Sequence, residues 1–273
     1  MLKWDQLREP ESGEERLWEL FHENSKVSPV DVAMSNEQVL ARMGEMHQTL
    51  PYDGHPRYAL PAPTTQLSLS VQDAILRRRT ARKLAAVPMS LEALASLLSL
   101  GYGITSDNRG NVFSRSFRAA PSGGALYPLE IYFHSVAIEG LPPGLFHYNP
   151  TRHDLRHLRD GDLSRDIAGG LLFQREIPEE SSIVIFLTAL FDRSTFKYGG
   201  RGYRFALLEA GHVAQNLNLA AVAMGLGVRN MGGYLDRHMD GLLGIDGCNH
   251  STVYMLAIGK LIDDGVSGVV APE

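Results

Sequence analysis

The segment from Pro121 to Pro128 is stiff and poor in side chains, and its residue types suit ligand binding. Gly123 and Gly124 permit positive φ and let the backbone approach a ligand closely. The two flanking prolines fix φ, and Ser122 adds a hydroxyl that can donate or accept a hydrogen bond. Such a segment suits a planar ligand or an anion. An ordinary tight turn would have the same composition, so both interpretations stay open at this point.

A second candidate for chemistry is a basic segment from Arg77 to Lys83, in which five of seven residues carry positive charge. Arginine guanidinium groups bind phosphate through two parallel hydrogen bonds, and a threonine hydroxyl can add a third contact. A solvated positive surface is the alternative. The candidate phosphate ligands are Arg78, Arg79, Thr80 and Arg82.

A third candidate is the adjacent pair Lys197 and Tyr198, within the polar, glycine-rich stretch 192–204. This stretch follows the apolar run 183–191, and we expect a functional loop there because loops beside buried strands often carry function. Both side chains can transfer protons, although a solvated lysine and a packing tyrosine are the simpler interpretation. A lysine acts as a base near neutral pH only where burial or nearby cations lower its pKa. Three arginines of the same stretch could supply such charge: Arg193, Arg201 and Arg204.

These residues must be positioned by a fold of helices and strands. Apolar and β-branched runs predict strands over 129–136, 144–149, 153–158, 183–191 and 252–259. Helical periodicity predicts helices over 14–22, 37–50, 71–76, 88–98 and 164–172, with the helix at 71–76 running into the basic segment. The longest helical pattern, 203–226, is apolar around almost its whole circumference, which predicts a central buried helix.

Polar residues on that helix need partners if they are buried. They are Glu209, His212, Gln215 and Asn216, and we interpret His212 as an interior histidine. A second glycine pair, Gly232 and Gly233, follows the helix.

The hairpin over 144–158 carries three histidines, His147, His153 and His157. Strand alternation alone places the last two on one face. Because no cluster of carboxylates or cysteines accompanies them, we expect no metal site.

Composition limits the class of protein. The chain has 273 residues, a net charge of −5 and one cysteine, Cys248, so neither nucleic-acid binding nor a disulfide framework is expected. The apolar run 183–191 is too short to span a membrane. These features are typical of a cytoplasmic globular protein. We expect an N-terminal extension over 1–65, helical and irregular, and one domain over 66–273.

The order of these motifs resembles that of the FMN-dependent nitroreductase superfamily. Four features follow one another along the chain in the order of that superfamily: the basic segment, the Pro-Ser-Gly-Gly turn, the long helix and the later glycine pair. The full motif from Pro121 to Pro128 is similar to the SagB-type branch, the azoline dehydrogenases of thiazole/oxazole-modified peptide biosynthesis. The Lys197–Tyr198 pair, the helix after it and residues 21–26 also resemble that branch, so the likeness covers roughly residues 20–260. Two departures are Thr80 where serine is usual, and Lys260 without a second basic residue after it.

The resemblance implies an α+β fold: a mostly antiparallel central sheet, flanked by helices around a long buried helix, in an intertwined homodimer. It implies FMN, with its phosphate on the basic segment and Lys260, and its ring against Pro121, Ser122, Gly123, Gly124, Gly232 and Gly233. It further implies oxidation of thiazoline or oxazoline rings in a precursor peptide, with hydride transfer to the flavin and Lys197 or Tyr198 as base. A cyclodehydratase is the implied partner.

Two other functions remain open from the sequence. One is an NAD(P)H-dependent nitro- or quinone reductase on the same fold. The other is a non-catalytic, flavin-binding scaffold subunit, against which the Lys197–Tyr198 pair argues.

Overall fold

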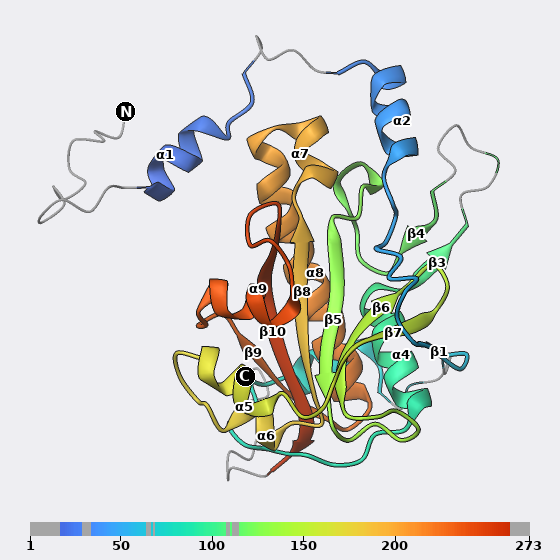
Figure 1. The fold of residues 1–273 in the computed structure, drawn as a ribbon, viewed down its shortest axis with the longest axis vertical. Coiled ribbons are helices and arrows are strands. Elements are labelled where there is room, and N and C mark those ends of the chain that lie inside the picture. The colour runs from blue at the N-terminus through green and yellow to red at the C-terminus, as the bar shows by residue number, and fades with distance from the viewer. Residues whose placement is uncertain are drawn as a thin grey trace, which may run out of the picture.

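The computed structural model describes residues 17–28, 34–63, 67, 69–107, 110 and 115–262. Its centre is an antiparallel sheet with the strand order β1-β7-β6-β5-β8-β10-β2, and β9 pairs with β10 as well (Figure 1). The strands of this sheet are β1 (Arg57–Ala59), β2 (Leu84–Ala85), β5 (Leu129–Ser135), β6 (Gly144–Asn149), β7 (Asp154–Asp160), β8 (Ile183–Leu190), β9 (Gly227–Met231) and β10 (His250–Leu261). Two short strands, β3 (Ile104–Ser106) and β4 (Phe117–Arg118), form a separate ribbon. The predicted antiparallel α+β fold is therefore confirmed.

Helices cover both faces of the sheet. They are α1 (Leu17–Asn24), α2 (Asn36–Glu45), α3 (Val71–Arg77), α4 (Leu91–Tyr102), α5 (Ser164–Gly170), α6 (Ile177–Glu180), α7 (Asp192–Tyr198), α8 (Gly200–Ala223) and α9 (Asp236–Leu243). Alternate residues of β5 and β8 belong to different cores, as strand geometry requires. Ile131 and Ile185 pack with α4 and α8, whereas Tyr132 and Phe186 pack with α5, α6 and α9.

Capping explains several helix boundaries. The Ser90 hydroxyl accepts a hydrogen bond from the backbone N–H of Ala93 at 3.2 Å, which fixes the start of α4 within the helix predicted over 88–98. Gly199 separates α7 from α8 because its φ of 52° and ψ of −141° interrupt the helix in a conformation that favours glycine. The stretch 192–204 is therefore helical rather than the predicted loop. Its polar residues belong to a short helix and to the first turn of a long one.

Two other helix predictions need correction. The helix that begins at Val71 ends at Arg77, so the basic segment beyond it is not helical. Thr80 instead bridges to Val228 beside β9. The predicted helix over 37–50 ends at Glu45, because Met46 takes an extended conformation with a φ of −90° and a ψ of 134°.

The central helix α8 is only partly enclosed. Its inner face is buried against the sheet and α4, but Leu207 and Leu208 are 41% and 60% exposed. His212 is exposed too, so the expectation of an interior histidine was wrong. None of the helices in the described ranges is long and apolar enough to cross a membrane.

The described part of residues 1–65 makes two kinds of contact. Residues 49–60 pack on the sheet, with β1 pairing with β7 and Leu60 in the core. The helix α1 has no buried residue and lies at the end where α7 lies (Figure 1), whereas α2 packs through its buried Val39 and Met43 against Leu126. The division at residue 65 stays a prediction.

Candidate functional site

The glycine-rich motif and the Lys197–Tyr198 pair meet directly. A Cβ atom added to Gly124 would lie 2.6 Å from the Tyr198 hydroxyl oxygen and 3.1 Å from Lys197 Nζ. Gly124 also has a φ of 66°. Both observations require glycine at this position, since a side chain would be strained and would displace the proton-transfer groups. Two motifs far apart in the sequence thus form one site.

The backbone of the motif is held in an uncommon conformation. Ala125 and Tyr127 have φ values of 52° and 48°, which are unusual for residues other than glycine. The Ser122 hydroxyl accepts a hydrogen bond from the Tyr127 backbone N–H at 2.9 Å. The Tyr127 hydroxyl in turn accepts one from the Arg118 backbone N–H at 3.0 Å. These contacts fix the shape of the turn, which is typical of strained backbone at functional sites.

A buried carboxylate lies beneath the motif. Glu209 is 2% exposed, and its Oε1 accepts a hydrogen bond from the Tyr102 hydroxyl at 2.7 Å. Its Oε2 has no hydrogen-bond partner among the residues that the structure describes. Burial raises the pKa of Glu209 to about 7, and the nearby Ser122, Tyr102 and Arg118 only partly oppose that effect. A buried acid with a pKa near neutrality beside a glycine-rich turn is a candidate for function.

In the sequence, Glu209 stands out only as a polar residue of the long helix that needs a partner. The available signal was a carboxylate within an otherwise apolar helix. Pro121, Ser122, Gly123 and Glu209 line one hollow of about 260 Å³, together with Phe205, Leu208 and His212. His212 therefore lies at the site although it is not interior.

The three arginines near Lys197 have different surroundings. Arg193 contacts the Glu130 carboxylate at 2.6 Å, and Arg204 donates to the Ser25 hydroxyl at 2.8 Å. Only Arg201 shares a cavity with Lys197 and Tyr198. Lys197 itself has no carboxylate partner in the described part of the chain, and its Nζ lies 5.0 Å from the centre of the Tyr198 ring. Within the described ranges, the Lys197 ammonium is thus not engaged by an ion pair.

The basic segment lies beside β9. The Ala81 backbone N–H donates to the Val228 carbonyl at 2.9 Å, and Arg229 Nη1 donates to the Ala81 carbonyl at 2.9 Å. The same strand leads to Gly232 and Gly233, four to five residues beyond Val228. At a rise of about 3.3 Å per residue, Val228 beside the basic segment and this glycine pair are separated by about 13–17 Å. A single elongated ligand can reach both.

The remaining phosphate candidates lie beside β2, at the cavity near the end of α8, or elsewhere in the basic segment. Lys260 is exposed and pairs in register with Ala85, just after the basic segment. Arg79 lines a cavity of about 330 Å³ with Arg77 and the end of α8. Arg78 is half-buried, whereas Thr80 and Arg82 are exposed.

The two glycine pairs are not brought together within one chain. Gly232 lines a hollow of about 390 Å³ with Tyr203 and Leu207 of α8. The motif lines another hollow, with Phe205 and Leu208 of the same helix. One chain therefore presents two partial sites on neighbouring faces of α8: a basic segment with a glycine pair, and a motif with Lys197 and Tyr198.

The three histidines of the hairpin take structural positions. His147 Nε2 lies 2.6 Å from the Glu130 carboxylate, and His153 Nδ1 lies 3.2 Å from the Tyr148 hydroxyl. His157 stacks on Phe146 with ring centres 4.6 Å apart. Within the described ranges, no group of three potential ligands is placed to hold a metal.

Comparison with known proteins gives relatives of two kinds. The putative nitroreductase MJ1384 of Methanocaldococcus jannaschii is 32% identical over 71% of this chain and 93% of its own length. The microcin B17-processing protein McbC of Escherichia coli is 30% identical over 54% of this chain and 56% of its own length. The chain thus spans most of the first relative but only about half of the second.

Solved structures agree on the fold. The Escherichia coli microcin synthetase McbBCD complex, with truncated pro-MccB17 bound, matches with a TM-score of 0.58 and 23% identity over 90% of this chain and 92% of its own. A putative nitroreductase from Exiguobacterium sibiricum, solved in complex with FMN, matches with a TM-score of 0.53 and 18% identity over 77% of this chain and 96% of its own. The model of the nitroreductase family matches residues 75–260, which include every candidate site residue. The chain therefore belongs to the nitroreductase family.

Proposed function

We propose that this protein is an FMN-dependent azoline dehydrogenase, which oxidises thiazoline or oxazoline rings of a ribosomal precursor peptide to thiazoles or oxazoles. The observation that carries the proposal is the contact between the motif and the proton-transfer pair. Gly124 leaves room for Lys197 Nζ and the Tyr198 hydroxyl at the surface of a rigid turn. The similarity of this chain to McbC, which is named a microcin B17-processing protein, also supports the proposal.

The residues of the chain fit FMN in size and charge. Arg78, Arg79, Thr80, Arg82 and Lys260 offer donors to a phosphate. Gly232 is exposed and has no side chain to block a flat ring, and it lies about 13 Å along β9 from the basic segment. When bound, FMN supplies a two-electron acceptor that no protein side chain provides.

A homodimer would complete the site. The motif and Gly232 open on neighbouring faces of α8, between which Leu207 and Leu208 stand exposed. Large exposed apolar side chains on a central helix are typical of an interface. Pairing α8 with a second copy would cover these leucines and bring the motif of one protomer toward Gly232 and Gly233 of its partner.

The chain's own chemistry is proton removal. Aromatisation of an azoline removes a hydride from one ring carbon and a proton from another, so that two electrons and two protons leave. Lys197 or Tyr198 accepts the proton, and general-base catalysis of this kind contributes roughly 10²–10⁴-fold. Molecular oxygen is the proposed final electron acceptor.

The proposed partners follow from this reaction. Azolines form when a cysteine, serine or threonine side chain cyclises onto the preceding peptide carbonyl with loss of water. A cyclodehydratase must therefore act on the precursor peptide first. The similar McbBCD assembly was solved with truncated pro-MccB17 bound, which supports a complex of this kind.

Substitution of the pair tests the proposal. We expect Lys197→Ala and Tyr198→Phe to retain bound FMN, measured by visible absorbance, but to lose roughly 10²–10⁴-fold in azoline oxidation, measured by mass spectrometry of the peptide. Arg165→Ala is the control, because Arg165 is exposed on α5 and belongs neither to the basic segment nor to the candidate residues. Unchanged rates in both variants would remove these residues from the chemistry.

A nitro- or quinone reductase is the second candidate, because MJ1384 is named a putative nitroreductase and aligns over most of its length. Rapid flavin reduction by NADPH, followed by turnover of a nitroaromatic, would favour it. Absence of that reduction together with azoline oxidation would exclude it.

A further inference from the structure

One cavity lies on the outer side of the Lys197–Tyr198 pair. It has a volume of about 470 Å³, within the range of roughly 300–1,000 Å³ that small ligands occupy. Its inner wall is the junction of α7 and α8, residues 197–201. Its outer wall is formed by residues 24–27 and Met34, from the segment N-terminal to the domain that carries the motif.

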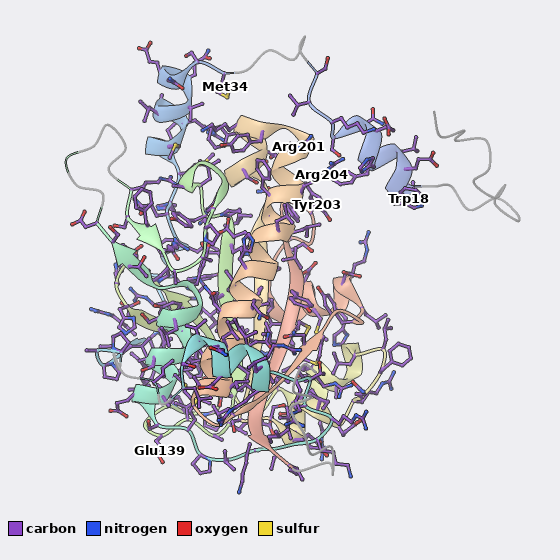
Figure 2. All side chains as sticks on the ribbon, turned by 180° about the vertical axis from the view of Figure 1, so that it is seen from behind. Trp18, Met34, Glu139, Arg201, Tyr203 and Arg204 are labelled. Carbon is purple, nitrogen blue, oxygen red and sulfur yellow. The ribbon has the colours of Figure 1, made fainter. Side chains whose placement is uncertain are left out.

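The outer wall is fastened to α8. Ser25 is 4% exposed, and its hydroxyl accepts a hydrogen bond from Arg204 Nε at 2.8 Å. Arg204 Nη2 also donates to the carbonyl of His22. The ring of Phe21 meets that of Tyr203 edge-on, with centres 5.2 Å apart. In Figure 2, Arg201, Tyr203 and Arg204 lie at the end of α8 nearest to Met34 and α1.

Glycine permits this close approach. A Cβ atom on Gly200 would lie 3.3 Å from Ser25 Cβ, so a larger residue would push the wall outward. A Cβ atom on Gly199 would have nothing within 4 Å, because Gly199 faces open space. The junction between the two helices is therefore shaped for close contact with the wall on one side and for an open cavity on the other.

The position of the cavity indicates what enters it. Lys197 and Tyr198 contact Gly124 on one side and line the cavity on the other, whereas the residues of the motif do not line it. A ring that gives up a proton to Lys197 or Tyr198 must lie against these side chains, so groups attached to the ring can reach the cavity that the same two side chains line. In a peptide, the attached groups are the neighbouring residues.

The charges that line the cavity indicate which kind of peptide residue it can hold beside the azoline ring. Lys26, Lys197 and Arg201 line the cavity, and its described lining includes no aspartate or glutamate. Lys26 is paired with Glu23 at 2.5 Å, which leaves Lys197 and Arg201 as the main source of positive charge. Val27 and Met34 add apolar surface. A neutral or acidic side chain is compatible with this lining, whereas a basic one is repelled.

We propose that residues 24–27 and Met34 form the outer wall of a substrate subsite that holds the peptide residue next to the azoline ring and disfavours a basic residue there. This inference rests on the proposed azoline oxidation. It gives the N-terminal segment a role in substrate selection, in addition to whatever it contributes to folding.

Filling the cavity is the direct test. Met34→Trp should raise KM for an azoline-containing peptide about tenfold or more, while kcat and bound FMN stay within about twofold. Leu20→Trp is the matched control, since Leu20 is 58% exposed on α1 and does not line the cavity. An unchanged KM in Met34→Trp, or an equal rise in both variants, would overturn the subsite.

Peptides that differ only beside the ring test its charge preference. A glutamate there should bind about two- to fivefold more tightly than a lysine, as expected for partly exposed charges. Binding is measured by fluorescence anisotropy of the labelled peptide on the FMN-loaded protein, so it does not depend on turnover. Equal affinities, or a preference for lysine, would contradict the inference.

The two proposals can fail separately. If the unmodified protein binds the peptides with the expected preference but oxidises none of them, azoline oxidation is wrong and the subsite stands as a peptide site. If the protein oxidises the peptides and Met34→Trp changes nothing, the subsite is wrong and the function stands.

Discussion

Two buried glutamates, Glu130 on β5 and Glu209 on α8, show how differently one residue type is used in this molecule. Glu130 is 1% exposed and has four partners among the residues that the structure describes: Arg193 and His147, each at 2.6 Å, the Thr49 hydroxyl at 2.9 Å and the Leu50 backbone N–H at 3.0 Å. Glu209 is 2% exposed; its Oε1 accepts from the Tyr102 hydroxyl, and its Oε2 has no hydrogen-bond partner in the described part of the chain.

Their pKa values move in opposite directions. Burial alone would raise the pKa of Glu130, but the Arg193 guanidinium and His147 hold it well below its usual range. For Glu209 burial prevails, and the pKa rises to about 7. A fully partnered carboxylate fixes the structure, whereas an incompletely partnered one beside a glycine-rich turn keeps a proton that can be exchanged near neutral pH.

The strongest test of this comparison is Glu130→Gln. Removing the charge leaves Arg193 buried without its counter-ion, which typically costs about 3–5 kcal/mol of the free energy of unfolding. Denaturant unfolding at pH 7 measures it. Glu45→Gln is the control, because Glu45 pairs with Arg42 at the surface and its loss should cost less than about 1 kcal/mol. Equal costs in the two variants would show that the Glu130 cluster is not a structural ion pair.

Glu130→Gln should lower the free energy of unfolding. Glu209→Gln should instead remove a loss of stability, and this effect should depend on pH. Between its ordinary pKa of 4.5 and its raised pKa of about 7, the unfolded chain releases the proton while the folded chain keeps it. Stability therefore falls as pH rises through this window, by about 3 kcal/mol in total. The variant lacks this loss, so it should be less destabilised than the native chain by a change from pH 4.5 to pH 8.

Thermal unfolding from pH 4.5 to 8 measures the Glu209 effect, with Glu45→Gln again as the surface control. Parallel pH profiles for the native chain and Glu209→Gln would mean that Glu209 does not retain its proton.

The smallest effect is expected from Thr49→Val. It removes one of the four donors to Glu130 and leaves the charge pair intact, so a cost of about 1–2 kcal/mol is expected from one hydrogen bond to a charged group. A cost as large as that of Glu130→Gln, measured by the same denaturant unfolding, would show that the cluster acts as one cooperative unit. A cost near zero would show that water replaces the hydroxyl.

Much of the fold was predictable because its signals are local. The apolar run 183–191 became the buried strand β8, and Ser90 capped α4. The stretch 192–204 was mistaken for a loop because its glycines and polar side chains are also typical of helix ends. Gly199 does interrupt the helix, but only at one residue.

The site was predictable as separate pieces. Glycine-rich and basic motifs are visible as types and spacings, but the meeting of Gly124 with Tyr198 depends on how α7 packs, which no local pattern reports. Glu209 was missed as a functional residue because its surroundings come from α4, β4 and the motif. The partnering of Glu130 was missed for the same reason, since Thr49 and His147 are distant in sequence.

The contacts of the N-terminal residues separate two tasks along one short stretch of chain. Thr49 and Leu50 hold the carboxylate of a central strand, whereas residues 24–27 and Met34 form the outer wall of a cavity and are attached to α8 through Ser25. We expect changes in the first group to lower the free energy of unfolding, and changes in the second group to leave the core unchanged. If the cavity selects the peptide, exchange of the outer segment alone can change the range of substrates. Substrate range can then diverge among relatives, or be redesigned, while the rest of the fold is kept.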